Sequence, residues 1–189
     1  MKNTLFYTAN MIDYFRLFLH IISIYTSKFI FVTLHLTSGF LDLIDGSVAR
    51  AYNQESTLGK CLDMFTDRLS SIIILIRSPI DNFTLLLLAI DIFSHNLFIS
   101  YHLIKNKHHK DNKNLILRLY HNIFILMPLC FLTEIYYVFL YLSNYYAINT
   151  LVNIFRIFYI MKSFFHVVMI YEAVKGLAVE EDTIDKKDE

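Results

Sequence analysis

Apolar residues gather along this chain into six stretches, each near the length that a helix needs to cross a membrane. A hydrocarbon core of about 30 Å requires roughly 20 helical residues. Runs such as "SSIIILI" and "FTLLLLAIDIF" do not alternate polar and apolar positions, which excludes the strands of a membrane barrel. The pattern therefore predicts an all-α integral membrane protein, a six-helix transmembrane bundle with spans at residues 6–25, 29–48, 60–77, 83–104, 117–142 and 150–174.

The connections between these spans form two alternating sets that differ in charge. Most lysines outside the spans fall in one set, which consists of the N-terminus, residues 49–59, residues 105–116 and the segment after 175. Because positive loops stay in the cytosol, this set and both termini are predicted to be cytosolic. The chain then divides into a membrane domain, residues 1–175, and a charged cytosolic tail, residues 176–189.

Composition agrees with a membrane protein and gives no sign of a nucleic-acid partner. Hydrophobic residues make up 56% of the chain and charged residues 18%, below the roughly 25% of soluble domains. The formal net charge is +0, so overall charge gives no argument for nucleic acid. Cys61 and Cys130 both lie in apolar runs and are interpreted as small buried hydrophobic residues.

Four aspartates stand out at the predicted cytosolic ends of the second and third spans. Asp42 and Asp45 are three residues apart, and Asp63 and Asp67 are four apart, so each pair lies on one helix face. The two helices are antiparallel and joined by a short turn, so all four carboxylates converge. Arg50 and Arg68 would neutralise part of this charge, but divalent cations bound by carboxylate oxygens would do so more completely.

Small residues accompany the aspartates. Gly46 follows Asp45, Ala49 lies four residues after Asp45, and Gly59 lies four before Asp63. They either let the helices pack closely or leave room for a flat nucleotide. Metals beside such a slot suit a diphosphate ligand, because metal ions bridge and neutralise phosphate oxygens.

The combined string is Asp-x-x-Asp-Gly-x-x-Ala-Arg, eight residues, then Gly-x-x-x-Asp-x-x-x-Asp, from Asp42 to Asp67. It resembles the signature of the CDP-alcohol phosphotransferase family. The segment "ARAYNQESTLGKCLDMFTDRLS" is most similar to the eukaryotic, inositol-using branch, and "ANMIDYFR", "DIFSH", "LRLYH" and "MKS" also resemble it. Two positions depart from the usual pattern: Ala9 replaces a common proline, and Ser56 a common threonine.

The resemblance implies transfer of the phosphatidyl group of CDP-diacylglycerol to myo-inositol, giving phosphatidylinositol and CMP. It also implies a homodimer and an active site at the cytosolic end of the second and third spans. Asp67 would be the general base. The implied ligands of Mg²⁺ or Mn²⁺ are Asp42, Asp45, Asp63 and Asp67. The implied residues at the nucleotide lipid are Gly46, Ala49, Arg50, Ser56 and Gly59. Arg118 and Lys162 are candidates for the alcohol pocket.

Alternatives remain open from the sequence. A sister enzyme of the same family would use glycerol 3-phosphate, serine or choline, and a divalent-cation transporter or a membrane scaffold would not be an enzyme at all. Asp91 and His95 form either a structural or a functional pair, and His20, His35 and His166 are interpreted as interhelical hydrogen-bonding residues. The ending "KKDE", with Lys186 and Lys187, resembles a dilysine retrieval signal of the endoplasmic reticulum, or is an ordinary charged tail.

Overall fold

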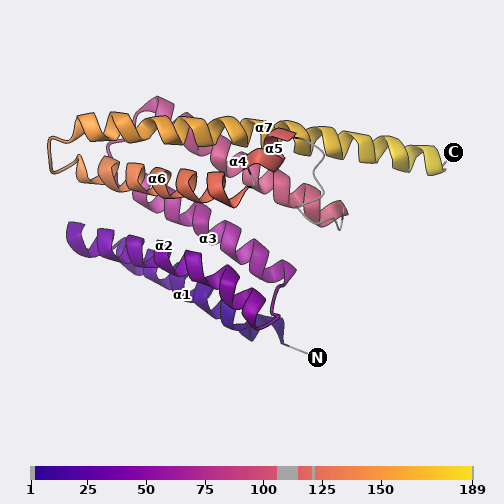
Figure 1. Ribbon diagram of the computed structural model, residues 1–189, viewed down its shortest axis with the longest axis horizontal. Coiled ribbons are helices and arrows are strands. Elements are labelled where there is room, and N and C mark those ends of the chain that lie inside the picture. The colour runs from indigo at the N-terminus through magenta and orange to yellow at the C-terminus, as the bar shows by residue number, and fades with distance from the viewer. Residues whose placement is uncertain (1–2, 106–114, 121, 189) are drawn as a thin grey trace. The chain divides into compact units, whose positions relative to one another are not determined.

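The structure, a computed structural model, describes residues 3–105, 115–120 and 122–188 (Figure 1). Over these residues the chain is helical and contains no strand. After a short 3₁₀ helix, η1, come α1 to α7, and the chain forms two compact units, Met1–Ser78 and Pro79–Glu189. Most of the predicted loop at 105–116 lies outside the described residues. Glu189, the last residue of the "KKDE" ending, also lies outside them. The helices are η1 Thr4–Phe6, α1 Thr8–Ser23, α2 Lys28–Ala51, α3 Thr57–Ile76, α4 Asn82–Lys105, α5 Leu115–Tyr120, α6 Ile123–Leu142 and α7 Asn149–Asp188.

Four helices of the described chain are long and apolar enough to cross a membrane: α2, α4, α6 and α7. The other two predicted spans correspond to α1 and α3. α1 has 16 residues, so at 1.5 Å per residue it is about 24 Å long, shorter than the hydrocarbon core. α3 has 20 residues but carries Lys60, Asp63, Asp67 and Arg68. The all-helical membrane character of the prediction is confirmed, and the count of six spans stays a prediction.

In the first unit, α1 packs against both α2 and α3. Polar side chains join these helices: Ser38 Oγ lies 2.8 Å from His20 Nε2, and Ser70 Oγ lies 3.4 Å from His35 Nδ1. This confirms the interpretation of both histidines as interhelical hydrogen-bonding residues. At the end of α3, Arg77 donates to the carbonyl of Ser23, the last residue of α1, at 2.9 Å. α1 and α3 therefore end at the same level and run in the same direction.

The connection between α2 and α3 has the geometry of a Schellman motif. Asn53 has a φ of 50°, a left-handed conformation that asparagine tolerates better than most residues. The Gln54 backbone N–H donates to the Ala49 carbonyl at 2.8 Å, and the Asn53 N–H donates to the Arg50 carbonyl at 3.2 Å. These bonds satisfy the last carbonyls of α2 and turn the chain tightly into α3.

In the second unit, α7 packs along α4 and α6, and the short α5 contacts α6 and α7. The predicted fifth span, residues 117–142, is divided in the structure: α5 ends at Tyr120 and α6 begins at Ile123. The reason is Asn122, whose side chain caps α6 by accepting from the Phe124 N–H at 3.0 Å. The buried core here comprises Phe98, Leu117, Tyr120, Leu129, Met169 and Ala173.

Candidate active site

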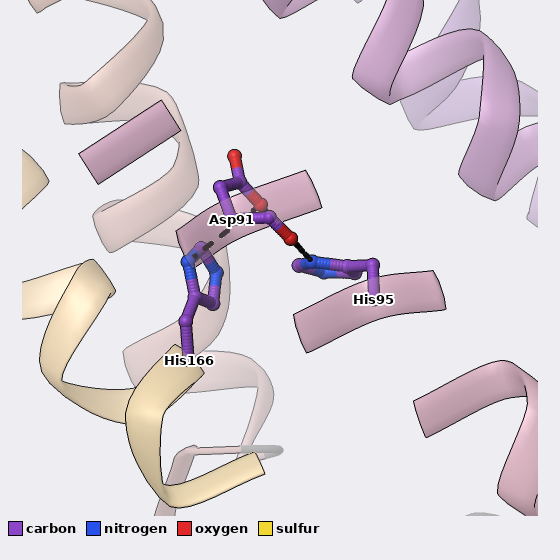
Figure 2. Close-up of side chains that lie close together, drawn as sticks. All are labelled: Asp91, His95 and His166. Atoms are coloured by element: carbon purple, nitrogen blue, oxygen red, sulfur yellow. Dashed lines mark hydrogen bonds and ion pairs between the residues drawn. The ribbon is translucent and has the colours of Figure 1, made fainter. Parts of the chain in front are cut away.

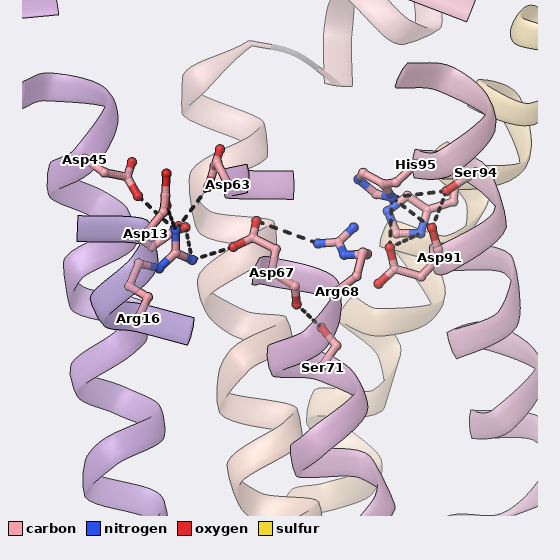
Figure 3. A network of polar contacts seen from close by, with 12 residues as sticks. Asp13, Arg16, Asp45, Asp63, Asp67, Arg68, Ser71, Asp91, Ser94 and His95 are labelled. Atoms are coloured by element: carbon pink, nitrogen blue, oxygen red, sulfur yellow. Dashed lines mark hydrogen bonds and ion pairs between the residues drawn. The ribbon is translucent and has the colours of Figure 1, made fainter. Parts of the chain in front are cut away.

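The four signature aspartates come together in the first unit, around the guanidinium group of Arg16. Figure 3 shows Arg16 reaching from α1 toward carboxylates of α2 and α3. Its Nη2 lies 2.5 Å from Asp42 Oδ1 and 2.6 Å from Asp67 Oδ1. Its Nη1 lies 2.9 Å from Asp45 Oδ2 and 3.1 Å from Asp63 Oδ1. The predicted convergence of the two aspartate pairs is therefore present in the structure.

The three helices bring their polar residues together in successive layers. Because α1 and α3 run in the same direction, residues three or four apart on each helix stay level with each other. Arg16 meets Asp42 and Asp67 in one layer. One turn nearer the α2–α3 connection, ligand oxygens of Asp13, Asp45 and Asp63 lie within 4.8 Å of one another.

Beyond these layers, toward the α2–α3 connection, lies a cavity of about 190 Å³. Seven of its lining residues belong to the predicted site: Asp45, Gly46, Ala49, Arg50, Ser56, Gly59 and Asp63. The other lining residues are Ala9, Asn10, Asp13, Gln54, Glu55 and Lys60. The predicted nucleotide-binding residues thus surround one hollow that adjoins the carboxylates.

Gly59 holds part of this cavity open. A Cβ atom at Gly59 would lie 2.8 Å from Asn10 Oδ1 and 3.2 Å from Ser56 Oγ, so any other residue would force neighbouring side chains to move. At Gly46 an added Cβ would meet only Arg50, at an ordinary 3.5 Å. The requirement for glycine in this structure is therefore much stricter at residue 59 than at residue 46.

Ser56 and Gln54 fix the edge of the cavity. Ser56 is the N-cap of α3, where its Oγ accepts from the Gly59 N–H at 3.0 Å. Gln54 Oε1 accepts from the Thr8 N–H at 2.7 Å, which ties the start of α1 to the α2–α3 connection. Ser56 therefore has a structural role in addition to the substrate contact predicted for it, and its hydroxyl hydrogen is still available to a ligand.

The carboxylates suit a hard divalent cation. They form two groups of ligand atoms, Asp13–Asp45–Asp63 and Asp42–Asp63–Asp67, which share Asp63. Every donor in these groups is a carboxylate oxygen, the donor type that favours Mg²⁺ and Mn²⁺ over softer metals. Arg16 contacts carboxylates of both groups, so a bound cation and the guanidinium group would compete for the same carboxylate oxygens.

Three polar residues of α1 at this site were not among the predicted site residues: Asn10, Asp13 and Arg16. All three are buried. The signal was present, because Asp13 and Arg16 interrupt an apolar run, and ionisable groups at membrane depth are functional candidates by default. Their spacing of three also places them on one helix face, together with Asn10.

The two candidates for the alcohol pocket, Arg118 and Lys162, belong to the second unit. Arg118 is exposed on α5, and Lys162 is buried on α7. Arg156, another cation of α7, pairs with Asp81 at 2.9 Å. A role in alcohol binding stays a prediction for Arg118 and Lys162.

A separate polar cluster lies within the second unit (Figure 2). His95 Nδ1 lies 3.0 Å from Asp91 Oδ1, and His166 Nδ1, on α7, lies 3.6 Å from the same oxygen. His95 Nδ1 is also 2.9 Å from the Asp91 carbonyl, so this nitrogen carries the proton and donates to Asp91. Asp91 and His166 are fully buried, and together they link α4 to α7.

Comparisons with known proteins agree with the signature string. The sequence matches the model of the family described as CDP-alcohol phosphatidyltransferase over residues 6–168. It is 35% identical over 152 residues to a CDP-diacylglycerol–inositol 3-phosphatidyltransferase of Drosophila melanogaster, covering 76% of this chain and 68% of the relative. The enzymes of the same name from Rattus norvegicus and Saccharomyces cerevisiae are each 33% identical, covering 76% and 75% of this chain and 74% and 70% of the relatives.

No solved structure matches the chain. The family match extends into both units of the structure and includes all the carboxylates that gather around Arg16. The chain belongs to the CDP-alcohol phosphatidyltransferase family.

Proposed function

We propose that this protein transfers the phosphatidyl group of CDP-diacylglycerol to myo-inositol, producing phosphatidylinositol and CMP. The observation that carries the proposal is the cavity of the first unit, where the predicted nucleotide-binding residues adjoin the signature aspartates. The names of the relatives from fly, rat and yeast support inositol as the acceptor.

In the proposed reaction a hydroxyl oxygen of inositol attacks the phosphorus that carries the diacylglycerol. A new oxygen–phosphorus bond forms as the bond from that phosphorus to the CMP oxygen breaks, and CMP leaves. Asp67 takes the proton of the attacking hydroxyl, and general-base catalysis of this kind contributes about 10²–10⁴-fold to a rate. Arg50, exposed at the edge of the cavity, is suited to hold a phosphate oxygen by charge-assisted hydrogen bonds.

Asp42, Asp45, Asp63 and Asp67 would hold Mg²⁺ or Mn²⁺ at the diphosphate. Bound there, a divalent cation neutralises charge that develops on phosphate oxygens. The protein's own contribution is to place the carboxylates on two helices and to keep a slot open beside them through Gly46, Ala49 and Gly59.

We also propose that the chain crosses the membrane of the endoplasmic reticulum six times, acts as a homodimer, and opens its site to the cytosol. A soluble polyol and a membrane lipid have to meet for this reaction. A site at the end of membrane helices receives both, because it adjoins the aqueous phase and the bilayer.

The function is tested by CMP release from CDP-diacylglycerol by purified protein, with a panel of alcohols. We expect release with myo-inositol and little with glycerol 3-phosphate, serine or choline, since a site built to pair hydroxyl groups rejects analogues lacking them. A chelator should abolish release, and Mg²⁺ or Mn²⁺ should restore it. Equal or faster release with glycerol 3-phosphate would assign a different acceptor within the family. No release with any alcohol would contradict an enzymatic function.

A further inference from the structure

We propose that Asp13 of α1 is a fifth carboxylate ligand for the divalent cations of this site, acting with Asp45 and Asp63. The inference rests on the proposed function, because it assigns a residue to the metal site described there. The signature string from Asp42 to Asp67 lies on α2 and α3 alone. Asp13 would make α1 a third wall of the metal site.

The position of Asp13 is the first argument. Its carboxylate lies within 4.8 Å of ligand oxygens of Asp45 and Asp63, one of the two carboxylate groups in the cluster. The other group, Asp42–Asp63–Asp67, consists of signature residues only. If both groups held a cation, each would offer three carboxylates only when Asp13 is counted.

The cost of burying Asp13 is the second argument. Asp13 is 2% exposed and contacts Arg16 at 3.1 Å, so a purely structural ion pair is the simpler explanation. Arg16, however, already contacts carboxylates of Asp42, Asp45, Asp63 and Asp67. Asp13 is a fifth carboxylate in this cluster and is itself buried, so it adds repulsion and desolvation that one shared guanidinium group does not offset. A bound cation would offset both.

The third argument comes from Asn10, one turn before Asp13 on the same face of α1. Asn10 is 0% exposed and lines the same cavity as Asp13. Its Nδ2 donates to the Thr4 carbonyl at 2.7 Å, which fixes the amide. Among the residues that the structure describes, its Oδ1 has no hydrogen-bond partner. A buried oxygen without a hydrogen-bond partner indicates that the cavity receives a ligand that donates a hydrogen bond or carries positive charge.

The test measures cation binding without turnover, on purified protein stripped of metal by a chelator. The readout is the thermal unfolding midpoint as a function of added Mn²⁺. In Asp13→Asn, half-maximal stabilisation should require at least about tenfold more Mn²⁺ than in the wild type. Even mutations of residues that only support a ligand lower metal affinity by about this factor. Asp81→Asn, which breaks the ion pair with Arg156 in the second unit, is the matched control: its midpoint without metal can differ, but half-maximal stabilisation should require the same Mn²⁺ concentration as in the wild type.

A second pair of variants separates a ligand from a structural partner, and decides the question if Asp13→Asn does not fold. Asp13→Cys offers a soft thiolate, whereas Asp13→Ser has similar size and no strong donor. Because thiolates prefer soft metals, the cysteine variant should be stabilised by Cd²⁺ at lower concentration than the serine variant. Cys61 and Cys130 are common to both proteins and cancel in the comparison.

Each result decides one point. Equal Cd²⁺ responses of the cysteine and serine variants, or a wild-type Mn²⁺ response in Asp13→Asn, would overturn the assignment of Asp13 and leave the proposed function intact. A wild-type protein that gains no stability from Mn²⁺ at all would overturn the metal site itself, and this inference with it.

Discussion

Asp67 is held from two sides, which sets it apart among the signature aspartates. Its Oδ1 contacts Arg16, and its Oδ2 lies 3.8 Å from Nη2 of Arg68, the next residue of α3. Its backbone carbonyl accepts from the Ser71 hydroxyl at 3.2 Å. The two arginine contacts orient a carboxylate that would have to meet a substrate hydroxyl.

Replacing Asp67 by asparagine keeps the size of the side chain and removes the proton acceptor. We expect the turnover number of Asp67→Asn to fall by at least about a hundredfold, the effect of losing a general base. Binding of CDP-diacylglycerol should persist, because Asp42, Asp45, Asp63 and Arg50 remain. Steady-state CMP release at saturating metal, with direct binding of the lipid nucleotide, measures both quantities. Near-normal turnover would remove Asp67 from the role of base.

Gly59 offers a second test at the level of a single residue. In Gly59→Ala the new Cβ would lie 2.8 Å from Asn10 Oδ1, so the cavity must deform. We expect the KM for CDP-diacylglycerol to rise and the KM for inositol to change little. Gly39→Ala is the control, since a Cβ there meets nothing within 4 Å, and replacing a helical glycine by alanine stabilises by about 1 kcal/mol. Unchanged kinetics in Gly59→Ala would show that this space is not used by the substrate.

At the scale of helices, the residues at the ends decide where each element begins. Asp81 precedes α4 directly, and its Oδ1 accepts from the Thr84 N–H at 2.8 Å, the geometry of an N-cap. The same carboxylate pairs with Arg156 of α7 at 2.9 Å. Hydrogen bonding by Thr84, together with Arg156, lowers the pKa of Asp81 below its usual value.

Two variants of Asp81 separate the cap from the charge. The asparagine side chain in Asp81→Asn can still cap α4, whereas Asp81→Ala loses both interactions, and lost caps typically cost about 0.5–2 kcal/mol. We expect a small loss of thermal stability for Asp81→Asn at neutral pH, because exposed ion pairs contribute about 0–1 kcal/mol. Asp81→Ala should lose clearly more thermal stability than Asp81→Asn. Thermal unfolding in detergent measures both.

The pH dependence of this difference has a definite sign. Since the pKa of Asp81 is lower in the folded protein, its charge stabilises the fold above the unfolded pKa of about 3.9. This contribution disappears as the pH falls through the lower, folded pKa. The gap between wild type and Asp81→Asn should therefore be full near pH 7 and shrink below about pH 4. A gap that grew on acidification would contradict the assignment.

The lengths of the apolar stretches were sufficient to predict the long helices, but neither the division of the fifth span into α5 and α6 nor every boundary. The third span was expected at 60–77. α3 covers Thr57–Ile76 and begins three residues earlier than expected, because Ser56 caps its N-terminus. The signature on α2 and α3 was visible because its residues are near one another in sequence. The contribution of α1 to the site was not visible in the sequence. Arg16 and Asp63 are 47 positions apart, and whether they meet depends on how α1 packs against α3.

For the whole molecule, the main question is how many times the chain crosses the bilayer. Four helices qualify by length and apolarity, and α1 and α3 do not qualify alone. The ion pairs of Arg16, however, join the acidic residues of α1, α2 and α3, namely Asp13, Asp42, Asp45, Asp63 and Asp67, within the first unit. A helix whose charges are paired inside a bundle can cross a membrane that would reject it alone.

Labelling of two positions distinguishes the six-span from the four-span arrangement. Tyr52 follows α2 and Tyr146 follows α6, and both side chains are exposed. With six spans these positions lie on opposite sides, and with α2, α4, α6 and α7 alone they lie on the same side. In sealed microsomes, with Cys61 and Cys130 replaced, an impermeant maleimide should label Tyr52→Cys directly. Tyr146→Cys should react only after permeabilisation, and labelling of both without it would favour four spans.

The buried position of Arg16 also has a consequence for how the protein enters the membrane during synthesis. Asp and Arg at the centre of a single helix each oppose insertion by about 2.5–3.5 kcal/mol. α1 carries both, and most partners of Arg16 lie on α2 and α3, which leave the ribosome later. In the six-span arrangement, α1 would therefore enter the lipid stably only together with the helices that neutralise it. Translocation and tertiary assembly of the first 78 residues would then be one cooperative step.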